Sequence, residues 1–272
     1  MFSRKRINRL INVDEIITGF EAKRKNGFYF SGESHNFWEM VFISSGKITA
    51  TADERVYHLT EGQLLFHKPV EYHRLWCEDG EEANTNIISF NANGEGMKYF
   101  EKSCFNLNEN ESRQIVEITR LFSKATENYI LKDMEKYNQF SNLGVSLLET
   151  LLLRLTEKNK HKQNEHTELE RKYYQIVKIM KENTDKKLSV LEIAELCNMS
   201  TSNLKRIFSF FSDIGIAKYF LNLKLRRACE LLAEGKTAAE TAQLLGFDEI
   251  SYFYKVFKRE IGITPKQYKK SI

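Results

Sequence analysis

The chain has 272 residues, of which 42% are hydrophobic and 29% charged, and its formal net charge is +4. This length suits two domains better than one, and no apolar run approaches the roughly 20 residues that a membrane-spanning helix requires. The first ten residues are basic and lead into Asn12, Asp14 and Glu15 instead of an apolar stretch, so we expect no secretory signal and a cytoplasmic protein.

The four cysteines favour a reducing compartment. They are scattered through the chain and form no Cys-x-x-Cys pair. Buried thiols are therefore expected, instead of a disulfide framework or a zinc site. The residues concerned are Cys77, Cys104, Cys197 and Cys229.

Residues 28–90 are predicted to form short β-strands separated by turns. The turn-forming pairs are Ser45-Gly46, Asp53-Glu54 and Glu61-Gly62. We therefore expect an antiparallel meander or β-barrel over about residues 20–95. The β-rich runs cover 28–30, 40–44, 47–52, 56–59, 63–66, 74–77 and 86–90.

A helical pattern replaces the strands over residues 111–157. Its clearest feature is an apolar stripe that is broader than a lone surface helix requires. Two interpretations are open: this helix packs within its own domain, or two chains pair through it. The stripe consists of Leu147, Leu148, Leu151, Leu152 and Leu155.

Residues 158–170 contain one apolar side chain, Leu169, and are predicted to be a linker. The linker separates a domain at 1–157 from a domain at 171–272. The second domain carries 19 Lys and Arg against 11 Asp and Glu, whereas the rest of the chain carries 22 against 26. This asymmetry favours an anionic polymer as partner, although a membrane surface or an acidic protein would also attract a basic domain.

Two short helices joined by a tight turn are predicted over residues 189–211. Ser189 and Glu192 form a capping-box pattern where the first helix begins. Asn198 is suited to the left-handed conformation that ends this helix, and Ser200 is the predicted N-cap of the second. The apolar positions of the second helix follow helical spacing, which is typical of a helix-turn-helix unit. These positions are Leu204, Ile207, Phe208 and Phe211.

The same pattern recurs near the end of the chain. Thr237–Leu244 is a predicted short helix, Gly246 its left-handed stop, and Asp248 the predicted N-cap of the helix that follows. A longer helix is expected over Ile216–Ala233 between the two copies. Pro265 after Thr264 predicts the start of a last helix. A duplicated unit is stronger evidence for DNA binding than one copy, because many short helix pairs bind nothing.

The second helix of each copy has an outward face of polar and basic side chains. Arg and Lys can bond guanine edges, Ser can bond base edges or phosphate, and Tyr can contact a thymine methyl group or a phosphate. Any one of these residues could equally be a solvated surface residue, but two matching basic faces favour DNA. The predicted DNA-binding residues are Ser202, Lys205, Arg206, Ser251, Tyr254, Lys255 and Lys258.

The C-terminal domain strongly resembles the AraC/XylS family of bacterial transcription regulators in LSVLEIAELCNMSTSNLKRIF, KYFLNLKLRRACELL and LLGFDEISYFYKVFKREIGITPKQYKK. The resemblance implies seven helices, with two recognition helices in adjacent segments of the major groove. It places base-reading positions at six of the predicted DNA-binding residues: Ser202, Lys205, Arg206, Ser251, Tyr254 and Lys255. Lys258 is not among them. The chain departs from the family at Ser209-Phe210 and Asp213, which predicts weaker phosphate contact, and at Lys224, where arginine is usual.

The N-terminal domain is similar to the cupin-like arm of that family. His35, Glu39 and Gly46 match half of a cupin metal motif, and GQLLFHKPVEYH resembles the strand and turn that follow it. Glu33 stands where the usual partner histidine would be, so we expect no metal and no cofactor. A small-molecule pocket is expected instead. Its candidate effector-binding residues are His35, Trp38, Glu39, His67, Tyr72 and His73.

The whole sequence therefore predicts an α+β two-domain protein, with a cupin-like antiparallel β-barrel and its following helices before an all-α domain. The expected function is sequence-specific transcription regulation, as an activator modulated by a sugar or other metabolite, and no enzyme activity is expected. Double-stranded DNA and a second copy of the chain are the expected partners. RNA polymerase is a further candidate partner.

Three other functions are compatible with parts of the sequence. A cupin metalloenzyme would require a bound metal. A DNA-alkyl transferase would require a reactive cysteine with electropositive neighbours, which none of the four cysteines has in sequence. An architectural DNA-binding protein would use its barrel only for dimerisation, and no small molecule would stabilise it.

Overall fold

Residues 8–158 and 167–271 are described by the computed structural model, in which the chain divides into two units. The first unit is built mainly from the residues before 159. The second is built from those after 166, together with the short segments Ser31–His35 and Asp53–Val56. No helix among the described residues combines the length and hydrophobicity that crossing a membrane requires.

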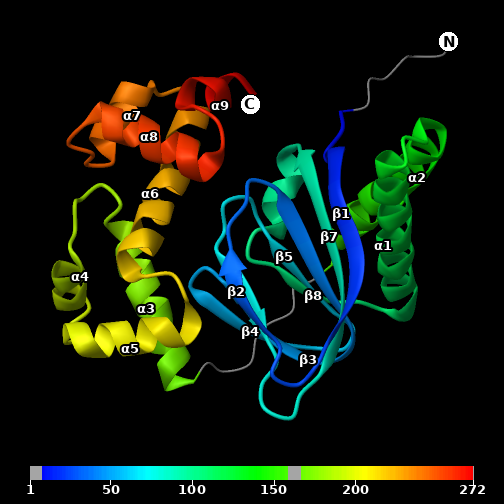
Figure 1. Ribbon diagram of the computed structural model, residues 1–272, viewed down its shortest axis with the longest axis horizontal. Helices are drawn as coiled ribbons and strands as arrows, with labels where there is room; N and C mark the ends of the chain where they lie inside the picture. Colours follow the sequence, from blue (N-terminus) through cyan, green and yellow to red (C-terminus); the bar gives the residue numbers. More distant parts are fainter. Residues whose placement is uncertain (1–7, 159–166, 272) are drawn as a thin grey trace. The chain divides into compact units, whose positions relative to one another are not determined.

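The strands of the first unit pair in the order β1-β7-β3-β5-β8, while β4 and β6 also pair with β3, and β2 pairs with β6 (Figure 1). An antiparallel sheet followed by helices is thus confirmed, but the described strands do not close into a barrel. The strands are β1 (Asn12–Arg24), β2 (Tyr29–Glu33), β3 (Trp38–Ala52), β4 (Arg55–Thr60), β5 (Gln63–His67), β6 (His73–Trp76), β7 (Ala83–Asn93) and β8 (Cys104–Asn106).

The turn predicted at Ser45-Gly46 was wrong, because β3 continues through these residues. Its pairing with β7 shifts register between Ile43 and Ser45, which marks a β-bulge. Gly46 has φ +77, and a Cβ added there would lie 1.9 Å from the carbonyl oxygen of Glu82. The glycine therefore permits a bend, and β3 pairs with β5 and β7 before it and with β6 after it.

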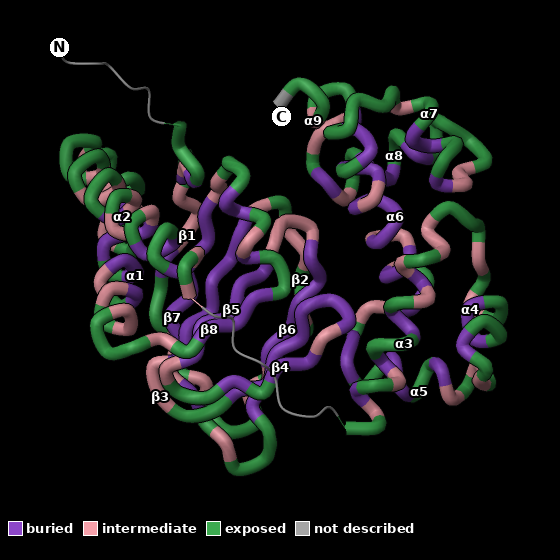
Figure 2. The backbone as a smooth tube through the Cα atoms, turned by 180° about the vertical axis from the view of Figure 1, so that it is seen from behind, coloured by how far each residue is buried: buried purple, intermediate pink, exposed green. Residues whose placement is uncertain are grey.

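Alternate residues of β3 face two different apolar cores. Val41 and Ile43 belong to a core made by the strands, together with residues such as Leu65 and Ile87. Met40 and Phe42 belong to a second core, which the sheet shares with the two helices that follow it. Figure 2 shows the strands largely buried and the outer surface of these helices exposed.

The two helices of the first unit are α1 (Glu109–Ile130) and α2 (Met134–Leu155), and a short 3-10 helix, η1 (Glu95–Phe100), precedes them. α1 begins with a capping box between Asn108 and Glu111. The leucine stripe of α2 packs against the sheet, so for these residues packing within the unit is the correct interpretation. The fully buried members of the stripe are Leu148, Leu151, Leu152 and Leu155.

The second unit contains seven helices within its described residues, as the resemblance implies. Residues 159–166 of the predicted linker lie outside the described residues. The linker prediction was wrong at its end, because Thr167 and Glu170 form a capping box that starts α3. The helices are α3 (Glu168–Glu182), α4 (Val190–Leu196), α5 (Thr201–Phe211), α6 (Ile216–Ala233), α7 (Ala238–Leu244), α8 (Ile250–Ile261) and α9 (Pro265–Ser271).

A buried ionic cluster ties the segment Asp53–Val56 into the second unit. The carboxylate of Asp53 accepts hydrogen bonds from both Nη atoms of Arg226, one of them at 2.8 Å. Lys181 bonds Asp53 at 3.3 Å and also bonds Glu54. The hydroxyl of Tyr173 donates to the carbonyl oxygen of Asp53 at 2.8 Å. Asp53 and Glu54 are 1% and 5% exposed, so their charges are compensated by these cations instead of by water.

Candidate functional site

The first helix-turn-helix consists of α4 and α5. Ser189 and Glu192 form the predicted capping box, and the hydroxyl of Ser200 accepts the backbone N–H of Asn203. Asn198 takes the left-handed conformation with φ +53. These three predictions are confirmed, and local capping is what fixes the ends of both helices.

The second helix-turn-helix, α7 and α8, repeats the hydrogen bonds of the first turn. The N–H of Met199 bonds the carbonyl oxygen of Ala194 at 3.0 Å, and the N–H of Phe247 bonds that of Ala242 at 3.0 Å. In each copy the N–H of the preceding residue, Asn198 or Gly246, bonds the carbonyl oxygen three positions back, which completes a Schellman motif. The predicted duplication therefore extends to individual backbone hydrogen bonds.

The N-cap predicted at Asp248 was wrong. Glu249 is the N-cap of α8 and makes no side-chain capping bond, while Asp248 pairs with Lys187. In the first copy Ser200 follows the left-handed Asn198 by two positions, whereas Glu249 follows Gly246 by three. The turn of the second copy is one residue longer. The spacing of the first copy therefore predicts the N-cap of α8 one residue too early.

The predicted DNA-binding residues lie on the exposed faces of α5 and α8, opposite a fully buried face. Leu204 and Ile207 in α5, and Phe253 and Val256 in α8, are each 0% exposed. Arg206 donates to the side chain of Asn203 at 3.0 Å, which leaves most of its donors toward solvent. All seven predicted residues are exposed: Ser202, Lys205, Arg206, Ser251, Tyr254, Lys255 and Lys258.

The aromatic pair at the end of α5 has two different environments. Phe211 is 2% exposed, and its ring centroid lies 4.7 Å from that of Tyr173 in α3. Phe210 is 57% exposed and contacts the ring of Phe211. Phe211 thus packs α5 on α3, whereas Phe210, where the chain departs from the family pattern, is exposed.

A polar layer of buried side chains crosses the sheet of the first unit. Glu39 of β3 pairs in register with His67 of β5 and with Ser89 of β7, so the three side chains point to the same face. The hydroxyl of Ser89 donates to Glu39 at 3.1 Å. Sequence reasoning did not identify Ser89, because the register that aligns it with Glu39 is not visible in the sequence.

His73 of β6 completes this polar layer. Its ring stacks on that of His67 at 4.3 Å, and its Nε2 lies 3.3 Å from Glu39. The Nδ1 of His67 lies 3.3 Å from the carboxylate of Glu71. Burial acts to lower the pKa of His73, but the hydrogen bond and charge of Glu39 outweigh it, so the pKa lies above its ordinary value.

Trp38, another predicted effector-binding residue, does not share this environment. Trp38 is adjacent to Glu39 on β3 and therefore faces the opposite core, with the helices. Tyr72 is 2% exposed, and His35 is half-buried.

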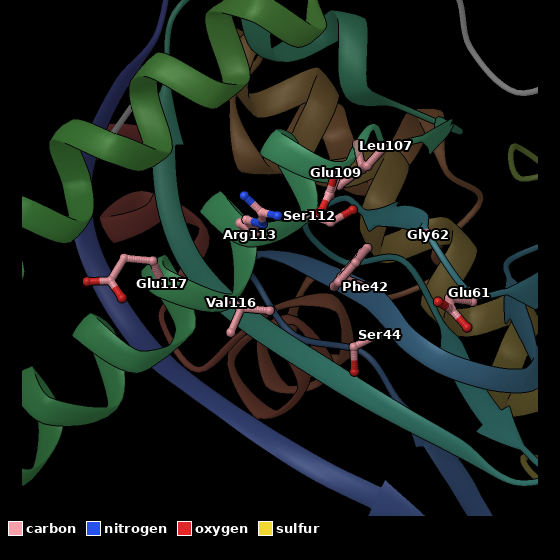
Figure 3. Close-up of a pocket in the computed structure, with 10 residues that line it drawn as sticks. All are labelled: Phe42, Ser44, Glu61, Gly62, Leu107, Glu109, Ser112, Arg113, Val116 and Glu117. Atoms are coloured by element: carbon pink, nitrogen blue, oxygen red, sulfur yellow. Dashed lines mark hydrogen bonds and ion pairs between the residues drawn. The ribbon is translucent and has the colours of Figure 1, made fainter.

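A cavity of about 660 Å³ lies elsewhere in the first unit, between α1 and the β3 and β5 region of the sheet. None of the six predicted effector-binding residues lines it. Figure 3 shows its residues coming from one side of α1, from β3 and from the turn before β5. The lining consists of Phe42, Ser44, Glu61, Gly62, Leu107, Glu109, Ser112, Arg113, Val116 and Glu117.

All four cysteines are buried, as predicted. Burial raises the pKa of the thiols of Cys104 and Cys229 to about 12 and that of Cys197 to about 11. Burial also raises the pKa of the Cys77 thiol. The thiolate is the nucleophilic form, so this environment disfavours a reactive cysteine.

Comparison with known proteins identifies both parts of the chain. Residues 193–271 match the family described as a helix-turn-helix domain, and residues 18–153 match the family described as an AraC-like ligand binding domain. The chain belongs to the AraC family of transcription regulators. It therefore combines a DNA-binding domain with a ligand-binding domain, and the resemblance found in the sequence is confirmed.

Several AraC-family relatives match along most of the chain. The transcriptional activator RhaS of Mannheimia succiniciproducens is 25% identical over 247 residues, covering 88% of each chain. The activator RhaR of the same organism is 20% identical over 240 residues, covering 86% of this chain and 85% of its own. Among solved structures, ToxT from Vibrio cholerae covers 98% of this chain and 99% of its own, at 12% identity and a TM-score of 0.40, a likeness too distant to bear on function.

Proposed function

We propose that this AraC-family regulator reads DNA through the exposed faces of α5 and α8, and activates transcription in the cytoplasm in response to a small molecule bound by its first unit. The observation that carries this proposal is the repetition of one Schellman turn in two helix pairs, each presenting basic side chains opposite a buried face. Activation is proposed because RhaS and RhaR are named transcriptional activators.

The guanidinium of Arg206 and the ammonium of Lys255 lie at the centre of the proposed DNA interface. Arg206 and Lys255 occupy the exposed faces of α5 and α8, and no ion pair of either is found within the described residues. Reversing both to Glu removes two cations and adds two anions beside phosphate. We expect the double variant to lose promoter affinity by at least a hundredfold at low salt and to show a shallower salt dependence.

Fluorescence anisotropy with fragments selected from genomic DNA measures this effect. The matched control reverses Lys172 and Lys178 to Glu, because both are solvent-accessible cations of α3 and neither belongs to a recognition helix. The proposal fails if both double variants lose affinity equally, or if the recognition-helix variant binds as well as the wild type.

We place the effector in the cavity between α1 and the sheet. Its apolar side chains include Phe42 and Val116, its hydroxyl groups come from Ser44 and Ser112, and its volume of about 660 Å³ is within the range of small-molecule sites. Apolar surface combined with hydroxyl and carboxylate groups suits a sugar or a similar polar metabolite. The polar layer around Glu39 is less suited, since its side chains already bond one another.

A thermal-shift screen with sugars and other metabolites tests the effector site. A compound that stabilises the wild type should not stabilise Val116→Trp, in which the indole fills the cavity, but should still stabilise Glu39→Gln. Loss of the effect in Glu39→Gln alone would assign the effector to the polar layer instead. No stabilisation by any metabolite would favour an architectural DNA-binding protein.

A second copy of the chain is the partner that we propose for α2. Leu143 and Leu153 are 50% and 43% exposed on α2, which leaves apolar surface available for pairing. Sedimentation of the Leu143→Glu, Leu153→Glu double variant should show a monomer where the wild type sediments as a dimer. RNA polymerase is proposed as the further partner of the activator.

A further inference from the structure

Lys224 of α6 is a buried cation with no ion-pair partner among the described residues. It is 6% exposed, and its ammonium donates one hydrogen bond, to the carbonyl oxygen of Leu245 at 2.7 Å. The ring centroids of Phe220 and Phe247 lie 5.3 and 5.4 Å from it. An ammonium carries three donors, and a buried charge is unfavourable unless it is paired. Lys224 therefore has both charge and donors to offer a ligand.

This ammonium borders a cavity of about 550 Å³ within the second unit. The walls are mainly apolar and aromatic, and they include the half-exposed Tyr252 and the buried Phe220. Both the volume and the composition are typical of a small-molecule site. The lining consists of Lys187, Leu188, Ala217, Phe220, Leu221, Lys224, Gly246, Phe247, Asp248, Glu249 and Tyr252.

The start of α8 adds a second feature that favours an anion. α8 has 12 residues, and its N-cap, Glu249, makes no side-chain capping bond. The N-terminus of a helix carries a partial positive charge and backbone N–H groups that point outward. Glu249 and Tyr252 line the cavity, so this helix end borders the same space as Lys224.

The two carboxylates of the lining do not neutralise Lys224. Asp248 is paired with Lys187, and both are largely exposed. Glu249 is exposed and accepts a hydrogen bond from the hydroxyl of Ser251 at 3.2 Å. Burial lowers the pKa of Lys224, and the distant charges of Asp185 and Asp248 oppose this only in part. A carboxylate bound beside the ammonium would favour its charged form.

We propose that this cavity binds an aromatic monocarboxylate, with its carboxylate at the ammonium of Lys224 and its ring against the rings of Phe247 and Tyr252, whose centroids lie 6.2 Å apart. The site lies in the DNA-binding unit and is separate from the effector cavity of the first unit. It adjoins the turn that positions α8, so an occupant can influence how the second helix-turn-helix is held.

Isothermal titration of the full-length protein with sodium 2-naphthoate tests the proposal. We expect the wild type to bind 2-naphthoate at least tenfold more tightly than its neutral isostere, 2-naphthamide. Lys224→Met should weaken naphthoate binding at least tenfold, because it keeps the length of the side chain and removes the charge. Lys178→Met, which removes an exposed cation of α3, should change it less than twofold.

A second variant tests the same site in case Lys224→Met does not fold. Tyr252 is 51% exposed, so Tyr252→Ala should fold, and it should weaken naphthoate binding several-fold by removing one wall. The proposal is overturned if Tyr252→Ala and Lys224→Met both bind like the wild type, or if the wild type binds no naphthoate at millimolar concentration. Inorganic phosphate that competes as well as naphthoate would also overturn it, since the site would then accept anions without regard to an aromatic ring.

Discussion

Single residues at helix ends set the geometry of both helix-turn-helix units. Asn198 and Gly246 occupy the same left-handed position in the two copies, with φ +53 and +63. A Cβ added to Gly246 would lie 2.5 Å from the carbonyl oxygen of Asp185, so this position is restricted by both conformation and space. Asparagine is tolerated in the first copy because it adopts left-handed conformations more readily than most residues.

Gly246→Ala should therefore destabilise the protein by about 2 to 3 kcal/mol, of which about 1 kcal/mol comes from the left-handed conformation alone. Gly262→Ala is the matched control, because Gly262 also has a positive φ, +86, but nothing lies within 4 Å of an added Cβ. Chemical denaturation measures both variants. Equal losses of stability would mean that the contact with Asp185 has no effect.

The buried pair of Arg226 and Asp53 should be necessary for the stability of the second unit. Arg226→Met leaves the Asp53 carboxylate, 1% exposed, without its bidentate partner, and breaking such a pair costs about 3 kcal/mol. Lys172→Met, which breaks an exposed pair with Glu168, should cost less than about 1 kcal/mol. Urea denaturation compares the two variants, and a loss for Arg226→Met no larger than that of the control would contradict this reading.

Glu54 should contribute a specific acid dependence. Burial acts to raise the pKa of Glu54, but the charge of Lys181 outweighs it, so the pKa lies below its ordinary value. A depressed carboxyl pKa stabilises the folded state above the unfolded pKa of about 4.3, and this contribution disappears as pH falls through the folded pKa. The wild type should thus lose more stability than Glu54→Gln between about pH 5 and pH 3. Parallel stability profiles for the two proteins would refute this.

The residues that could be predicted from sequence are those whose partners are close in sequence. The capping boxes at Ser189 and Thr237 and the left-handed Asn198 follow from local patterns. Asp53 and Arg226 are too far apart in sequence for any local pattern to connect them. The polar layer was predicted in part, because Glu39, His67 and His73 carry the motif but only strand register adds Ser89.

The helices α1 and α2 pack closely at a glycine of α2. α2 passes Phe122 of α1 at Gly144, where an added Cβ would lie 2.5 Å from the ring. The helices can therefore share one core with the sheet. The helical region was predictable from the sequence, because the spacing of its apolar residues is a local pattern. The strand β1 was missed, because its exposed Asp14, Glu15 and Glu21 interrupt the strand pattern.

Gly144→Ala should destabilise the first unit by about 1 to 3 kcal/mol, because overpacking outweighs the gain of about 1 kcal/mol that alanine gives in a helix. Combining it with Phe122→Leu, which removes the ring, should cost less than the sum of the two single changes. Thermal and urea denaturation of the three variants provide this double-mutant cycle. Additive losses would show that the ring and Gly144 do not interact.

At the scale of the whole molecule, the AraC-family chain assigns its two tasks to different units. The first contains the ligand-binding domain and the second the duplicated helix-turn-helix. The basic excess of residues 171–272 is consistent with this assignment, since only the second unit must approach an anionic duplex. The fold class was predictable because the hydrophobic period changes along the chain, whereas the closed barrel was wrong because strand order depends on contacts distant in sequence.

Both helix-turn-helix units should contact one DNA duplex, and footprinting on fragments selected by the protein tests this most directly. We expect two adjacent protected segments at low ionic strength, one lost in Arg206→Glu and the other in Lys255→Glu. The absence of protection on every selected fragment, or the loss of the same single segment in both variants, would contradict it.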